Sequence, residues 1–323
     1  ALFTAEAAFP AGGLRYRIRS GGQSSAAGIF PGTLPLKAGD TVELFTGAAA
    51  GWLYSPRFVP AGRQPRLILH VVIDAMRRDA LAAGGGTPRI APHLNRLAQE
   101  ATFFSAARTP SNWTRPATTA FFTGLYPWQS RIPTTVFGLA AADQRPFHEL
   151  RTTTLPLTLR RAGWYTAAVV NNVFMVGTTP LGLDFGFNRI LDIRSDGPDT
   201  AWITQEAIRT IDRHQGDSLY LFLNYNAPHG PYAPPPAFLR QVAGLQPDHY
   251  RRYMGEVAFS DAALGEVLAH LRRRGLYEEA LIVVHSDHGE ILEDTHSRAA
   301  FFPYMLRYTH GETAYRQAIS VPL

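Results

Sequence analysis

Three long apolar runs constrain the fold of this chain most strongly, because each has the character of a strand buried on both faces. They are LILHVVID from Leu67, LYLFLNY from Leu219 and ALIVVHSDHGE from Ala280. Continuous apolar runs are typical of parallel sheets covered by helices, whereas half-exposed strands alternate. Between these runs lie the strand-like YTAAVV at 165–170 and helical patterns at 91–101, 154–162 and 248–273. Strands alternating with helices predict an α/β fold with a mostly parallel sheet flanked by helices.

The first sixty residues differ in texture from the rest. Residues 1–62 are rich in Gly and Ala and contain short alternating stretches such as LRYRIRS and TVELFTG. This pattern predicts short strands in a small β-rich N-terminal module. We therefore expect two domains, 1–62 and a larger α/β domain at 66–323. The closing residues AISVPL look like the start of a buried strand, so we expect the sequence to be a fragment truncated at its C-terminus.

Composition excludes several classes of protein. A length of 323 residues with 46% hydrophobic residues is ample for a large core. The net charge of +5 is not gathered into a block, so we expect no nucleic-acid partner. The chain has no cysteine, so disulfides are excluded. Cysteine usage therefore gives no information about the redox state of the cellular compartment. No apolar run approaches the roughly 18 residues of a membrane span, so we expect no transmembrane segment in this chain.

Polar groups follow the predicted strands, where ligands gather in open α/β sheets. Asp74 follows the first run, the segment 224–229 follows the second, and Asp287 and His288 follow the third. A single terminal Asp is usually a cap or turn residue. An Asp–His pair after an apolar strand is costly to desolvate unless something compensates its charge, and a divalent cation would do so. Two carboxylates, an imidazole and a hydroxyl would suit zinc or manganese.

The stretch SNWTRPATTAFFTGLYP, from Ser111, predicts a short helix. Pro116 suits the first helical position and Gly124 suits the residue just past the end. Thr114 would then lie just ahead of the helix N-terminus, where unpaired N–H groups favour negative charge. Two interpretations follow. Thr114 is either an N-cap or a hydroxyl presented for chemistry.

Together these motifs resemble the sulfatase branch of the alkaline phosphatase superfamily over about residues 66–323. The matching pieces occur in the family's order: VVIDAMRRDAL, PHLNRLAQEATFFSAARTPSNWTRPATTAFFTGLYP, TLPLTLRRAGWYTAAVVNN, GLDFGFNRILD, PHGPYAPP, SDHGE and HGETAYRQAISVPL. The resemblance implies a metal-bound nucleophile at Thr114. Formylglycine sulfatases have Cys or Ser there, in Cys/Ser-x-Pro-x-Arg, whereas this chain reads Thr-Arg-Pro-Ala-Thr. Threonine cannot form the aldehyde. It is instead the nucleophile of superfamily members that act on phosphate esters, such as phosphodiesterases and phosphoethanolamine or phosphoglycerol transferases.

The resemblance also implies the site residues. The metal ligands would be Asp74, Thr114, Asp287 and His288. An Asp–His pair favours zinc or manganese over calcium or magnesium. His229 and His310 match family histidines that contact the transferred group, protonate the leaving oxygen or hold a weaker second metal. For substrate binding, Arg115 either clamps a non-bridging oxygen or faces solvent, and Asn172 would donate to a substrate oxygen.

We therefore expect a metal-dependent hydrolase or transferase that acts on phosphate esters through Thr114. The alternatives are a sulfate-ester hydrolase and a catalytically silent relative that binds glycans or lipid head groups. The expected partner is an anionic phosphate or sulfate ester, of a lipid head group or a glycan. The resemblance favours a periplasmic or extracellular location. His285, inside a strand, is expected in the core, and His296 in a loop.

Overall fold

A five-stranded parallel sheet forms the centre of the computed structural model. The model describes residues 2–8, 14–21, 23–29, 33–37, 40–46, 52–59, 66–133, 139–149, 153–172, 174, 186–192, 200–293, 310–311 and 313–323. The strands are β7 (Leu67–Ile73), β8 (Tyr165–Val170), β9 (Arg189–Asp192), β10 (Leu219–Tyr225) and β11 (Leu281–His285). Their order in the sheet is β11-β7-β10-β8-β9, and every pair is parallel. The predicted α/β fold is confirmed.

The apolar runs of β7 and β10 are continuous because both faces of the sheet are covered there. The expectation that the third run is buried on both faces is wrong, because β11 is an edge strand that is only partly buried, with Leu281 57% exposed. In β7, Leu69, Val71 and Ile73 pack into one hydrophobic cluster, while Val72 packs into another. In β10, residues likewise alternate between the two clusters. Successive side chains of a strand point to opposite faces, so each strand supplies apolar residues to two cores.

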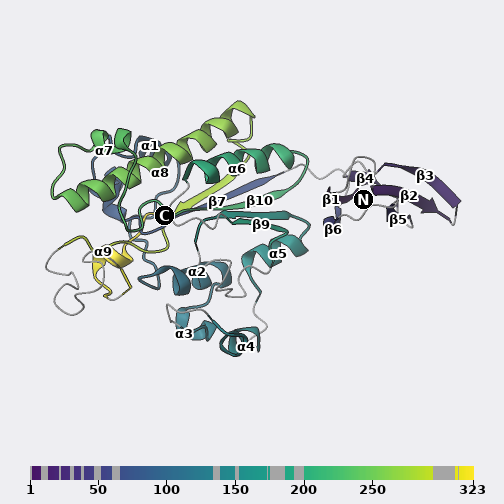
Figure 1. The fold of residues 1–323 in the computed structure, drawn as a ribbon, viewed down its shortest axis with the longest axis horizontal. Helices are drawn as coiled ribbons and strands as arrows, with labels where there is room; N and C mark the ends of the chain where they lie inside the picture. Colours follow the sequence, from purple (N-terminus) through teal and green to yellow (C-terminus); the bar gives the residue numbers. More distant parts are fainter. Residues whose placement is uncertain are drawn as a thin grey trace.

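Helices form a layer on each face of the sheet (Figure 1). One layer contains α1 (Pro92–Glu100), α6 (Thr200–Arg213), α7 (Pro236–Gln241) and α8 (Asp248–Arg273). The opposite layer contains α2 (Thr114–Thr123), α3 (Pro127–Ser130), α4 (Ala141–Glu149) and α5 (Leu155–Arg161). The short elements η1 (Arg78–Ala80), η2 (Ala82–Gly84) and α9 (Arg316–Ile319) lie in connecting segments. The three helical patterns predicted from sequence correspond to α1, α5 and α8.

Short antiparallel strands make up the N-terminal part. β1 (Leu2–Ala8) lies between β4 (Thr33–Pro35) and β6 (Trp52–Val59). β2 (Leu14–Ser20) lies between β3 (Gln23–Ile29) and β5 (Thr41–Thr46). Both three-stranded sheets are antiparallel, as the short alternating stretches predict. Division into domains at residues 62 and 66 stays a prediction.

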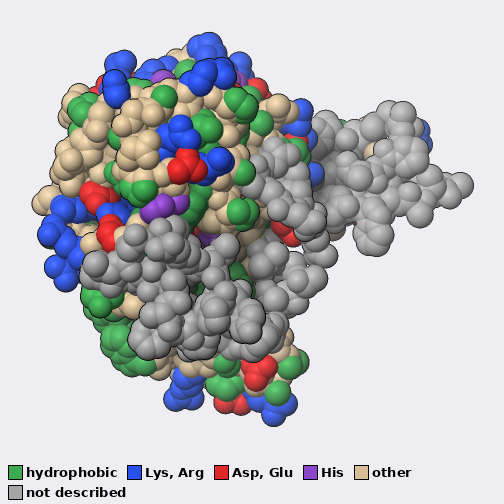
Figure 2. Space-filling view, turned by 60° about the vertical axis from the view of Figure 1, so that its left-hand side comes forward, with side chains coloured by type: hydrophobic (Ala, Val, Ile, Leu, Met, Phe, Trp, Pro, Cys, Tyr) green, Lys and Arg blue, Asp and Glu red, His purple; other side chains and the backbone are tan. Residues whose placement is uncertain are grey.

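The surface carries mixed charge. On the described part of the face in Figure 2, arginine side chains lie in small groups among acidic and polar side chains. Among the described residues, no helix combines the length and apolar character needed to cross a membrane.

Candidate active site

Four neighbouring strands bring polar side chains to one edge of the sheet. Asp74 follows β7, Asn172 follows β8, Asn226 follows β10, and Asp287 and His288 follow β11. The carboxyl ends of parallel strands meet at one edge, so residues more than two hundred positions apart become neighbours. The backbone N–H of Asp74 donates to the Tyr225 carbonyl at 2.8 Å, which extends the β7–β10 pairing by one residue. The predicted convergence of these strand ends is present in the structure.

Helix α2 adds Thr114 to this edge. The helix begins at Thr114 itself, with Trp113 as N-cap and no side-chain cap. The predictions that Pro116 starts the helix and that Thr114 could be its N-cap are therefore wrong. At the first helical position the Thr114 hydroxyl makes no capping hydrogen bond. It lies 3.4 Å from Asp74 Oδ2 and 3.2 Å from His288 Nε2. The helix ends as predicted, with Gly124 left-handed at φ 70°.

The centre formed by Asp74, Thr114, Asp287 and His288 has more acceptors than donors. His288 Nδ1 lies 2.9 Å from the Gly289 carbonyl, which can only accept, so Nδ1 carries the proton and Nε2 presents a lone pair. That nitrogen lies 3.4 Å from a carboxylate oxygen of each aspartate. Asp74 Oδ1 and Asp287 Oδ2 are buried without a hydrogen-bond partner among the described residues.

A divalent cation fits this donor set. The ligand atoms of Asp74, Asp287 and His288 all lie within 4.8 Å of one another, and all three residues are buried. Orphaned buried carboxylate oxygens are costly, and a cation would compensate both of them and the imidazole lone pair at once. Oxygen and nitrogen ligands of this kind suit zinc or manganese.

The same electrostatics shift the protonation equilibria. Burial, together with the Asp287 carboxylate, raises the pKa of Asp74 well above its ordinary value. Burial lowers the pKa of His288. Both directions reduce the charge that the metal-free centre has to bear.

His229 and His310 lie beside this centre. The His310 ring lies 4.1 Å from the His288 ring and 4.8 Å from the His229 ring, measured between centroids. His229 Nδ1 is 2.7 Å from the Gly230 carbonyl, so its Nε2 carries the free lone pair. The structure thus places His310 against the candidate metal ligand His288, and His229 against His310.

Glu290 is a site residue that the sequence analysis did not single out. It is 1% exposed, and its Oε1 and Oε2 lie 3.1 and 3.3 Å from His310 Nδ1. Burial raises the pKa of Glu290 to about 7, and burial lowers the pKa of His310 to about 3, so near neutrality the imidazole is uncharged and the carboxyl group is partly ionised. The signal was present in the sequence, because Glu290 closes the SDHGE element that supplies Asp287 and His288.

The surroundings of Arg115 and Asn172 differ from those predicted from the sequence. Arg115 is 0% exposed, so the solvent-facing interpretation is wrong. Its guanidinium carbon lies 5.7 and 5.1 Å from the ring centroids of Trp113 and Phe174. Asn172 Nδ2 donates to Asp74 Oδ2 at 2.7 Å and lies 3.3 Å from Asn226 Oδ1. Asn172 therefore orients a candidate metal ligand, and contact with substrate stays a prediction.

His285 lies apart from the centre. Its Nε2 is 2.7 Å from Nε2 of His70, whose Nδ1 is 2.8 Å from the Tyr220 hydroxyl. Burial lowers the pKa of both histidines, so they form a neutral pair. His285 itself is only partly buried, on the edge strand β11 and in the lining of a cavity, so the expected core position is met only in part. His296 lies outside the described residues.

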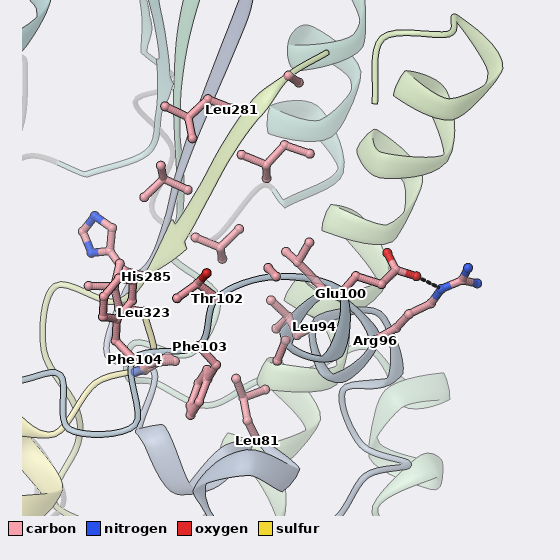
Figure 3. Close-up of a pocket in the computed structure, with 18 of the residues that line it drawn as sticks. Leu81, Leu94, Arg96, Glu100, Thr102, Phe103, Phe104, Leu281, His285 and Leu323 are labelled. Carbon is pink, nitrogen blue, oxygen red and sulfur yellow. Dashed lines mark hydrogen bonds and ion pairs between the residues drawn. The ribbon is translucent and has the colours of Figure 1, made fainter. Parts of the chain in front are cut away.

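A cavity of about 670 Å³ lies away from this centre (Figure 3). It runs along the edge strand β11 and α1, and its lining includes Leu94, Phe103, Leu281 and Leu323. None of the eight predicted site residues lines it. The cluster of potential metal-ligand atoms therefore locates the candidate active site better than cavity size does.

Comparisons with known proteins agree with this architecture. Residues 66–323 match the family model described as Sulfatase. The phosphonate monoester hydrolase of Agrobacterium radiobacter has a TM-score of 0.62 and 17% identity, over 80% of this chain and 67% of that one. The C-terminal periplasmic domain of EcEptC from Escherichia coli, in complex with Zn, has a TM-score of 0.61 and 14% identity, over 81% and 72%. Ps i-CgsB in complex with k-i-k-neocarrahexaose has a TM-score of 0.61 and 18% identity, over 80% of this chain but 65% of that one, so this chain spans less than two thirds of its length.

Proposed function

Because this chain belongs to the sulfatase family, within the alkaline phosphatase superfamily, we propose that it is a metal-dependent hydrolase or transferase acting on phosphate esters through Thr114. The observation that carries the proposal is the position of the Thr114 hydroxyl. It lies at the first position of α2, within 3.4 Å of Asp74 and His288, and is unused as a cap.

A divalent cation held by Asp74, Thr114, Asp287 and His288 would lower the pKa of the Thr114 hydroxyl and neutralise charge on the transferred group. The complex of the EcEptC domain with Zn supports a cation of that kind. Asn172 holds Asp74 in place through its 2.7 Å hydrogen bond. The N-terminus of α2 adds a favourable field for negative charge at the same hydroxyl.

The chain's own residues can then carry out group transfer. A bond forms between Thr114 Oγ1 and phosphorus as the bond from phosphorus to the leaving oxygen breaks. The proton that Thr114 Oγ1 loses is taken up by the lone pair of His229 or His310 and is then passed to that leaving oxygen; His310 packs against His288, and His229 packs against His310. Water or an acceptor alcohol releases the phosphoryl group from Thr114 in the second half. Arg115, the buried second residue of α2, adds positive charge that favours the phosphoryl group.

Phosphate esters should turn over faster than sulfate esters, by on the order of a hundredfold in kcat/KM. A formylglycine diol expels sulfate by collapsing to the aldehyde, but a sulfated threonine has no such route. The measurement is kcat/KM for an aryl phosphodiester, a phosphomonoester and an aryl sulfate with the same leaving group, with zinc or manganese supplied. A preference for the sulfate would favour a sulfate-ester hydrolase instead. No turnover of any of them, with metal bound, would favour a silent relative.

Glu290→Gln should lower kcat on the order of tenfold to a hundredfold, as for other carboxylates that orient an imidazole, with a smaller change in KM. The amide oxygen still accepts from His310 Nδ1, but it has no negative charge to stabilise the imidazole while that ring holds a transferred proton. Glu290→Ala should be slower still, and His310→Ala should lose roughly a hundredfold or more. Thermal melting of the variants separates this effect from unfolding. Wild-type kcat in both Glu290 variants would show that the contact is structural only.

The ester's organic part is not specified by this centre. The i-CgsB complex contains an oligosaccharide, and the hydrolase from Agrobacterium radiobacter is named for phosphonate monoesters. We propose an ester of a glycan or of a lipid head group as the substrate class.

A further inference from the structure

The turn that follows Asp74 has a strained backbone. Ala75 has a φ of 56°, in the left-handed region. This region is unfavourable for alanine, because its Cβ crowds the following carbonyl oxygen. A residue other than glycine persists there only where the surrounding structure holds it in place. Because the turn comes directly after a candidate metal ligand, the contacts that hold it also govern where the Asp74 carboxylate lies.

Two side chains at the end of β11 hold one side of this turn. The Ala75 N–H donates to Asp287 Oδ1 at 3.3 Å, and the Met76 N–H donates to Ser286 Oγ at 2.9 Å. The Ser286 hydroxyl in turn donates to the His288 carbonyl at 2.5 Å. These bonds join the turn to the segment that supplies two further candidate metal ligands, Asp287 and His288.

Tyr253, in the middle of α8, holds the other side of the turn. Its hydroxyl donates to the Ala75 carbonyl at 2.9 Å and accepts from the Arg77 N–H at 2.8 Å. Tyr253, Ala75 and Arg77 are all buried. Removal of the hydroxyl would therefore take away the partner of two buried backbone groups at once, which is costly. One side chain thus bridges the residues on either side of Met76, and one of the two is the strained residue itself.

We propose that Tyr253 is a positioning residue for the metal centre. Its hydroxyl holds Ala75 in the left-handed conformation, and this fixes the Asp74 carboxylate beside Asp287 and His288. Without the hydroxyl, the turn can relax toward an ordinary backbone conformation, which carries the Asp74 carboxylate away from the other ligands. The inference rests on the proposed function for its catalytic meaning, but the metal binding that tests it does not require turnover.

Tyr253→Phe removes the hydroxyl and keeps the ring. Zinc is titrated into the metal-stripped protein in competition with a chromophoric chelator, and Asp287→Asn is measured alongside to define binding at other sites. We expect the Kd for zinc to rise about tenfold to a hundredfold in Tyr253→Phe, as for other partners that orient metal ligands. The zinc concentration that gives half-maximal turnover should rise by the same factor.

Tyr220→Phe is the matched control. It removes another fully buried tyrosine hydroxyl, which lies 2.8 Å from His70 Nδ1 and away from the turn. Each of the two variants leaves a buried polar group without its partner, so both should lower the Tm of the metal-free protein. Only Tyr253→Phe should weaken zinc binding, measured at a temperature where melting curves show every variant to be folded.

Ala75→Gly tests whether Tyr253 acts through the strained turn. Glycine adopts the left-handed conformation without a Cβ penalty, so the turn then needs less support from the hydroxyl. In the Tyr253→Phe background, Ala75→Gly should therefore recover part of the lost zinc affinity, severalfold in Kd. A tyrosine that only supported the fold would give no such recovery.

Unchanged zinc affinity in Tyr253→Phe, an equal loss in Tyr220→Phe, or no recovery with Ala75→Gly would overturn the proposal. Any of these results, in a wild type that binds zinc and turns over a phosphate ester, would leave the proposed function in place. Zinc binding that is weakened in Tyr253→Phe, in a wild type that turns over no ester, would support the positioning role and count against the proposed function. Absence of zinc binding in the wild type would overturn both.

Discussion

Replacing Thr114 with alanine should lower kcat for a phosphate ester roughly ten-thousand-fold or more, as for other removed nucleophiles. The hydroxyl lies 3.4 Å from Asp74 Oδ2 and 3.2 Å from His288 Nε2, and it caps nothing. The fold should change little, because α2 begins on the Trp113 backbone and Thr114 contributes no cap. Steady-state kinetics with an aryl phosphodiester, alongside thermal melting, gives both results.

Two further variants complete this test. Thr114→Ser keeps a hydroxyl in the same place and should retain measurable turnover. Thr119→Ala removes a buried hydroxyl of the same helix, one that donates to the Arg115 carbonyl, and should stay within about tenfold of wild-type kcat. Substantial activity in Thr114→Ala would show that the attacking group lies elsewhere.

Removal of divalent cations should abolish turnover, and adding them back should restore it. In Asp287→Asn, turnover should stay absent even when cations are supplied. Asp287 Oδ2 is an orphaned buried oxygen, whereas Asp287 Oδ1 accepts the N–H groups of Ala75 and His288. An asparagine keeps the second set of bonds but replaces the orphaned oxygen with an amide donor facing His288 Nε2. The metal-free variant should therefore be more stable than the metal-free wild type, by about 1–3 kcal/mol.

Asp287→Asn should thus abolish turnover while raising the stability of the metal-free protein. A damaged fold would lower both, so the two measurements distinguish a lost metal ligand from misfolding. Added zinc or manganese should raise the Tm of the wild type, because a cation that binds only the folded state stabilises it. The same addition should leave the Tm of Asp287→Asn unchanged. Asp248→Asn, at a surface carboxylate paired with Arg251 and Arg252, should behave as the wild type. Equal metal content in Asp287→Asn and wild type, by elemental analysis, would contradict this assignment.

The sheet could be predicted because the burial of each strand shows in that strand's own sequence. β7, β8 and β10 are covered on both faces, so their sequences are continuous apolar runs that stand out without knowledge of the fold. The order of the strands in the sheet cannot be read from a short stretch of sequence, but the polar residues that follow each apolar run can. That pattern sufficed to predict that Asp74 and Asp287 would meet.

Other features depend on packing that no local pattern records. α6 went undetected although Ile203, Ala207 and Ile211 recur every four residues and are buried. The start of α2 was misplaced because Pro116 is a strong helix-start signal, while the helix actually begins two residues earlier, on Trp113.

The surroundings of single side chains were the hardest part to predict. Arginines are usually exposed, but Arg115 is buried against Trp113 and Phe174, and Phe174 is 59 residues away in the sequence. The contact between Glu290 and His310 joins the end of β11 to a segment twenty residues later. Such pairs are set by tertiary structure, so only the residue types, and not their partners, could be read from the sequence.

The most direct test of the central claim is to trap the group on Thr114. The metal-replete protein would be mixed with an aryl phosphodiester, quenched in acid within milliseconds and digested for mass spectrometry. We expect a phosphoryl adduct, bearing the retained ester group, on the peptide that contains Thr114, and no adduct in Thr114→Ala. Turnover in the same sample with Thr114 unmodified at every quench time, or an adduct on another residue, would contradict it.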